Sequence, residues 1–129
     1  MTSMPPRQLP PMPTWREAME SVYQNMRAAG TRASGLLEHR RHAESECEHA
    51  GLSLARKSDP EVSGVRYIAR STIPQDDGQR AAALALRRAD SEWQRAVSEQ
   101  KHWEQSWKWY ADELDAHPEL ADQPCRRFE

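Results

Sequence analysis

The fold is decided by residues 15–54, which read WREAMESVYQNMRAAGTRASGLLEHRRHAESECEHAGLSL. Apolar residues recur along this stretch in alternating steps of about four and three, and Arg40 is the polar interruption. A second stretch, residues 82–114, has the same alternation with Gln100 as its polar member. Such spacing is typical of the seam of a coiled coil. The sequence therefore predicts two long helices that pack along apolar seams.

The two seams fit each other when the second runs antiparallel to the first. With Leu54 set opposite Ala82, large residues face small ones, because Trp93 then meets Ala43, Trp103 meets Ala33 and Trp107 meets Ala29. Close packing favours such pairs, since a ring can fill the space above an alanine. We predict an all-α fold, a long antiparallel helical hairpin of the coiled-coil type. One seam between two helices buries little surface, so we also expect association into a helical bundle.

The two polar seam residues lie close together in this register. We interpret Arg40 and Gln100 as buried polar groups that fix the register at some cost in stability. The alternative is that Arg40 extends outward to Glu44 or to a partner.

Proline and turn residues divide the chain around this hairpin. Five prolines among residues 1–13 favour an extended arm. The hairpin is predicted over residues 14–117, with a long connecting loop at 55–81 and a loosely docked tail at 118–129.

Capping signals mark the helix ends. Thr14 and Glu17 have the spacing of a capping box, so the first helix is expected to start there and to run to about Arg56. Asp76 or Asp77 can cap the second helix, although Thr72 with Pro74 just inside permits an earlier start. This helix is expected to end near His117 because Pro118 follows.

Composition narrows the class of protein. The formal net charge of −2 gives no general attraction to nucleic acid or anionic lipid. No apolar run approaches the length of a membrane span, and two separated cysteines, Cys47 and Cys125, do not form a disulfide framework. We expect a cytoplasmic protein with free thiols and no membrane partner. Its size and composition fit a phage-encoded structural or host-directed protein.

Two Glu-x-x-His units, Glu46 with His49 and Glu99 with His102, have a spacing used in di-iron bundles. All four side chains fall beside the seam or farther toward solvent, and the predicted register separates the two units along the axis. No sequence motif of a nucleophilic site or a phosphate-binding loop occurs. We therefore expect no metal, no cofactor and no enzyme activity.

One flank of the seam is small and apolar, and it favours contact with another helix. Tyr23, Leu37 and Val97 line this predicted groove. Trp109 is a large residue outside the seam that can anchor a partner, and the alternative is that the chain's own tail buries it. The simplest function is a non-catalytic interaction or assembly protein that binds a protein partner or self-associates as a homo-oligomer.

The tip of the hairpin offers an alternative function. Arg66, Tyr67 and Arg70 belong to a basic group of side chains, and an aromatic ring among arginines can hold single-stranded nucleic acid. Several aspartates and glutamates share the same region, which weakens this reading. The second hypothesis is a nucleic-acid-associated protein that binds through the arginine-rich tip.

Overall fold

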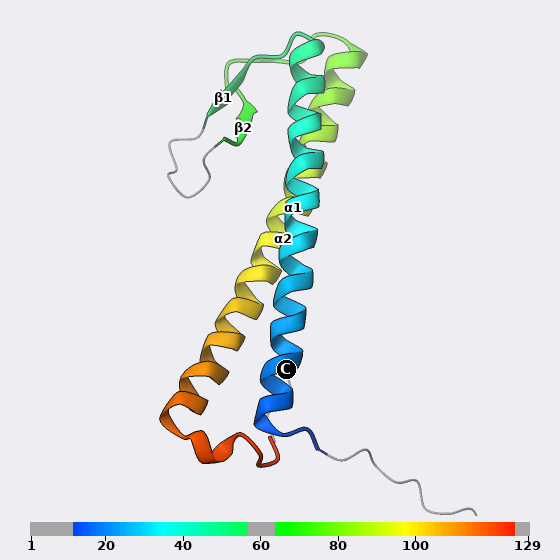
Figure 1. Cartoon of the computed structure of the whole chain (residues 1–129). Helices are drawn as coiled ribbons and strands as arrows, with labels where there is room; N and C mark the ends of the chain where they lie inside the picture. Colours follow the sequence, from blue (N-terminus) through cyan, green and yellow to red (C-terminus); the bar gives the residue numbers. More distant parts are fainter. Residues whose placement is uncertain (1–11, 57–63, 126–129) are drawn as a thin grey trace, which may run out of the picture. The chain divides into compact units, whose positions relative to one another are not determined.

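Two long helices form most of the structure. The computed structural model describes residues 12–56 and 64–125. Helix α1 spans Trp15–His49 and helix α2 spans Asp77–Ala116, and they pack against each other as an antiparallel helical hairpin (Figure 1). The predicted fold class is confirmed. Strands β1, Leu54–Arg56, and β2, Arg66–Ile68, pair antiparallel within the connection, and the short helix η2, Pro118–Leu120, follows α2.

The described chain divides into two compact units, and each long helix contributes to both. The arm unit contains residues 27–56 and 64–102, and the tail unit contains residues 12–26 and 103–125. Each unit has its own cluster of apolar side chains. We describe each unit by itself.

Most buried positions within the helices follow the predicted seams, while Glu44, Ala83 and Ser106 are buried outside them. In the arm unit the buried seam residues of α1 are Ala29, Ala33, Arg40, Ala43 and Cys47, and those of α2 are Leu86, Ala89 and Ala96. The tail unit adds Val22 and Tyr110. The periodicity therefore identified the buried stripe of both helices, because burial of one apolar face is what the alternating spacing selects for.

The predicted register is wrong within the arm unit by about one heptad. Cys47 Sγ lies 3.2 Å from the carbonyl oxygen of Ala82, whereas the sequence placed Leu54 there. Likewise Arg40 pairs with Asp90 instead of lying opposite Ala96. A slip of one heptad leaves both seams in contact, so spacing alone does not distinguish the two registers. The observed register gives the buried Arg40 guanidinium a carboxylate, and burying that charge without one is costly.

Helix α1 ends earlier than predicted, at His49, and Gly51 is the reason. Gly51 has a φ of +89°, a conformation that residues with a Cβ rarely adopt. The Leu52 N–H donates to the carbonyl of Cys47, and the Gly51 N–H donates to that of Glu48. These two bonds form a Schellman motif, whose usual apolar contact is supplied by Leu52 and Cys47 in one cluster.

The other predicted caps are confirmed. Glu17 N–H donates to Thr14 Oγ1 and Thr14 N–H donates to Glu17 Oε1, as a capping box requires. Asp76 caps α2 by accepting the Gln79 N–H at 2.8 Å. Helix α2 ends at Ala116, one residue before the expected His117.

The C-terminal segment of the tail unit is docked closely, contrary to the expectation of a loose tail. The carbonyls of Gln123 and Ala121 accept the first two N–H groups of α1, from Trp15 and Arg16, at 3.1 Å each. The start of a helix leaves such donors without partners inside the helix. Cys125 is fully buried, and its N–H donates to the carbonyl of Pro13. The tail is held because it completes the hydrogen bonding of α1.

Candidate interaction surface

Strands β1 and β2 form a small two-stranded sheet, which we call the β arm, and it lies beside α1 in the arm unit (Figure 1). Ala55 pairs with Tyr67 at its centre. The register places the N–H and C=O groups of Arg66 on the edge of β2 that faces away from β1. These two backbone groups would be unpaired if the sheet simply ended there.

Two side chains of α1 form hydrogen bonds with these backbone groups of Arg66. The Arg66 N–H donates to Glu44 Oε1 at 2.9 Å, and the Arg66 carbonyl accepts from Arg40 Nη2 at 3.0 Å. Glu44 and Arg40 are one helical turn apart and pair with each other at 3.0 Å. They therefore act together as a substitute for a neighbouring strand, with one acceptor and one donor.

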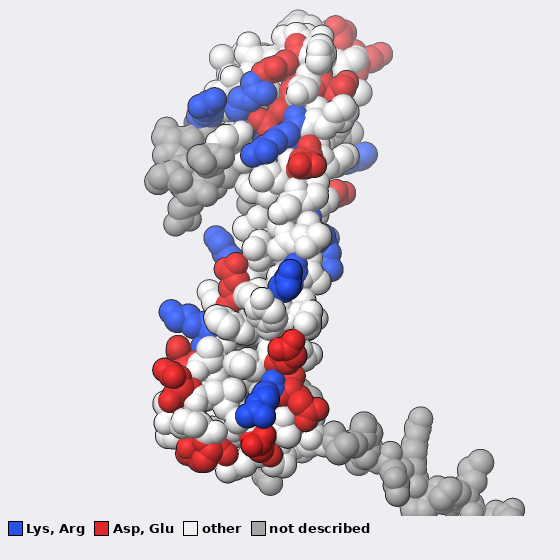
Figure 2. Space-filling model, in the orientation of Figure 1, with Lys and Arg blue, Asp and Glu red and all other residues white. Residues whose placement is uncertain are grey.

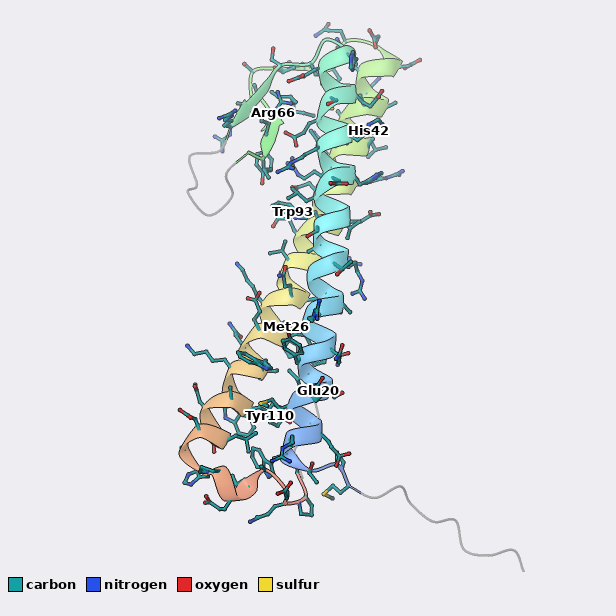
Figure 3. All side chains as sticks on the ribbon, in the orientation of Figure 1. Glu20, Met26, His42, Arg66, Trp93 and Tyr110 are labelled. Atoms are coloured by element: carbon teal, nitrogen blue, oxygen red, sulfur yellow. The ribbon has the colours of Figure 1, made fainter. Side chains whose placement is uncertain are left out.

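The surrounding charges complete a buried network. Arg40 has no exposed surface, and its Nε donates to Asp90 Oδ1 of α2 at 2.8 Å. The Arg66 side chain extends from β2 toward α1 and pairs with Glu44 and Glu48 (Figure 3). The Arg40 guanidinium also lies 4.8 Å from the centroid of the Tyr67 ring and 5.8 Å from that of Trp93. Arg40 Nη1 and Glu44 Oε2 face each other at 3.0 Å as an ion pair, although neither of these buried atoms has a hydrogen-bond partner among the described residues. A buried ion pair contributes stability only when its charges are closely paired.

This network decides between the two readings of Arg40. The side chain is buried, so it does not extend into solvent, although Glu44 is one of its partners as the alternative reading supposed. It holds α1, α2 and the β arm in one arrangement. Gln100 lies beside the backbone of Gly30, whose added Cβ would come within 3.4 Å of the Gln100 amide nitrogen.

The residues predicted for the nucleic-acid hypothesis have different surroundings. Arg66 and Tyr67 lie together on β2, but the Arg66 side chain is engaged by carboxylates and Arg40 stacks on Tyr67. Arg70 is exposed just beyond β2. Acidic and basic side chains lie close together over this part of the arm unit (Figure 2). Arg66 and Arg80 of the tip are paired with carboxylates, and acidic side chains lie among the other arginines, so the tip is not one basic surface.

The predicted apolar groove is covered in part by the chain itself. The β arm packs over the flank that contains Glu44 and Asp90, where the sequence suggested that a second helix would lie. Leu37 and Val97, also of the arm unit, are half-buried. The sequence did not predict this cover, because Glu44 has the position of a solvent-facing glutamate. Its partner Arg66 is 22 positions away in the chain.

The other two predicted partner residues belong to the tail unit. Tyr23 is half-buried, with its ring centroid 6.3 Å from that of Trp107. Trp109 stacks on Trp15 at 5.5 Å and meets Tyr110 edge to face at 5.0 Å. Tyr110, which projects from α2 in Figure 3, is buried in this cluster. Packing within the unit therefore accounts for much of the Trp109 surface.

The two cysteine thiols, which are the strongest candidate nucleophiles, are buried. Cys47 and Cys125 are free thiols, as expected, and both are buried. Burial raises the pKa of the Cys47 thiol, and Glu44 and Glu46 raise it further, so the nucleophilic thiolate is disfavoured. In the described ranges no three His, Cys, Asp or Glu side chains gather as metal ligands. Glu99 pairs with Arg32 at 2.6 Å, and Glu46 lies 3.6 Å from His42.

Neither long helix is apolar enough over a sufficient length to cross a bilayer, within the part of the chain that the structure describes. Comparison with known proteins finds no matching family model, no matching curated protein and no matching solved structure.

Proposed function

We propose that this protein is a non-catalytic interaction or assembly protein, which presents the arm unit to a protein partner or to a second copy of itself. The observation that carries the proposal is the side chain of Ile73, which is 71% exposed in the connection that leads into α2. A patch of exposed apolar side chains is typical of an interaction site. Leu84, in the second turn of α2, is 46% exposed.

The charged groups of the arm unit support the same proposal. Arg40, Glu44 and Arg66 pair with one another and with the backbone of β2, so these charges hold the β arm against α1. A β arm whose strand β2 is held against α1 by buried ion pairs loses little conformational freedom when it binds, which favours recognition.

Substitution of Ile73 tests the proposal. The purified chain and its Ile73→Asp variant are compared by sedimentation velocity at micromolar concentrations and by affinity capture from the native host. We expect self-association, or capture of a specific protein, that Ile73→Asp abolishes and that the control Ser98→Asp, at an exposed position of α2, leaves intact.

One set of results would favour the nucleic-acid hypothesis instead. If the wild type sediments as a monomer, captures the same proteins as Ile73→Asp and is retained on single-stranded nucleic acid in a salt-dependent manner, the nucleic-acid hypothesis replaces this one.

A further inference from the structure

A cavity of about 340 Å³ lies in the arm unit between residues 67–72, which include the end of β2 and the segment after it, and residues 86–90 of α2. Ile68, the last residue of β2, and Ala69 line it from one side, and Leu86 lines it from the helix. The volume is at the lower end of the range for small-molecule sites, so it suits one side chain or a small organic group. Part of the wall is apolar, which favours a ligand that carries a hydrocarbon portion.

Two arginines stand at this cavity from opposite sides. Arg70 comes from the segment after β2 and Arg87 from α2, and both are exposed. Among the described residues, neither is paired with a carboxylate. Two guanidinium groups around one small cavity repel each other unless an anion lies between them. Arginine is also the side chain best suited to a carboxylate, which it can bind through two parallel hydrogen bonds.

The remaining charges of the lining are already neutralised. Asp90 lines the cavity, but it accepts the Arg40 Nε–H at 2.8 Å. Arg40 is further held by Glu44 and by the carbonyl of Arg66. The positive charge available to a ligand therefore comes from Arg70 and Arg87. Thr72 adds a hydroxyl that can accept or donate a hydrogen bond.

We propose that this cavity binds a carboxylate group carried on an apolar stem, with Arg70 and Arg87 on the carboxylate and Ile68, Ala69 and Leu86 around the stem. The source of the carboxylate is a peptide segment of the protein partner, an assignment that rests on the proposed function. A nucleic-acid strand fits less well, because the cavity is small and its lining combines the two exposed arginines with the apolar side chains of Ile68, Ala69 and Leu86.

The binding test titrates three small probes into the isolated 129-residue chain and monitors its backbone amide signals by ¹⁵N NMR. N-acetyl-leucine supplies a carboxylate and an aliphatic side chain, N-acetyl-leucinamide has the same side chain without the charge, and phenyl phosphate replaces the carboxylate by a phosphate. We expect N-acetyl-leucine to shift the amide signals of Ala69, Thr72 and Arg87 in a saturable manner, with millimolar affinity. N-acetyl-leucinamide is expected to bind at least about tenfold more weakly.

Variants then locate the site. Arg70→Gln and Arg87→Gln are each expected to weaken N-acetyl-leucine binding by about tenfold, because each removes one charge-assisted contact. Arg88→Gln is the matched control, since Arg88 is exposed on the next position of α2 and does not line the cavity.

Several outcomes overturn the inference. Equal binding of N-acetyl-leucinamide would remove the carboxylate from the recognition. Preferential binding of phenyl phosphate would identify the site as one for phosphate, and an equal loss in Arg88→Gln would place the contact elsewhere. These measurements use no partner protein, so they test the cavity independently of the proposed function. Loss of probe binding with intact Ile73-dependent capture would reject only the cavity. Probe binding without Ile73-dependent capture would reject only the proposed function.

Discussion

The two units of this hairpin cover their helices with short segments of chain, but they hold those segments by different forces. The tail unit uses aromatic packing around Tyr110 and backbone hydrogen bonds from the C-terminal segment to the start of α1. The arm unit uses a buried ion network, with Arg40 and Glu44 bound to the backbone of β2. Apolar burial tolerates small losses of fit, whereas a buried charge depends on each of its partners. The arm unit should therefore respond more sharply to single substitutions.

The largest expected effect tests that contrast at Arg40. Arg40→Met keeps much of the side-chain volume but removes one of the two cations that pair with the buried Glu44, the arginine that pairs with Asp90 and the donor to the Arg66 carbonyl. We expect the free energy of unfolding, measured in urea, to fall by about 3–5 kcal/mol. Arg41→Met, at the exposed neighbouring position, is the control and should change it by less than about 0.5 kcal/mol. Similar losses in both variants would show that charge burial does not hold the arm.

The corresponding substitution in the tail unit is Trp109→Ala. Trp109 is half-buried and stacks on Trp15, so its removal should lower the free energy of unfolding by about 2 kcal/mol, less than the loss at Arg40. The same variant separates packing from recognition. If capture of a partner is lost while stability is unchanged, Trp109 is an interface anchor and not part of the aromatic cluster.

Two glycines test where α1 ends, because one lies inside the helix and the other just after it. Gly51→Ala places a Cβ on a residue with φ of +89° at the end of α1, and it should destabilise the protein by about 1 kcal/mol. Gly35→Ala lies inside α1, where an added Cβ meets nothing within 4 Å, and it should stabilise by up to about 1 kcal/mol. Thermal unfolding of both variants checks the opposite signs, and a shared sign would contradict the assigned end of α1.

The smallest effect is expected at an exposed ion pair of the arm unit. Arg32 and Glu99 join α1 and α2 at 2.6 Å, but their side chains are 53% and 43% exposed. Solvent screens such pairs, so Arg32→Gln should cost no more than about 0.5 kcal/mol, and less at high salt. A loss as large as that of Arg40→Met, measured by the same urea titration, would mean that burial is not what distinguishes the two arginines.

The candidate surface could be anticipated only in part. The sequence pointed to Arg66, Tyr67 and Arg70 as a group, and the structure does bring them to the β arm and its flank. Their roles differ, however, because Arg66 is turned inward by Glu44 and Glu48 while Arg70 lines the cavity with Arg87. Residue type and spacing do not reveal which arginine finds a carboxylate. That assignment depends on a contact between residues 22 positions apart.

The sequence by itself determined which faces of the two helices are buried, where α1 starts and where α2 starts and ends, because these depend on local periodicity and on capping side chains within one or two turns. Tertiary structure alone decided the register, the end of α1 and the close docking of the C-terminal segment. A heptad seam repeats, so several registers satisfy it equally. The arm unit adopts the register in which the buried charge of Arg40 meets Asp90 and Glu44. A register that left this buried charge unpaired would destabilise the fold strongly.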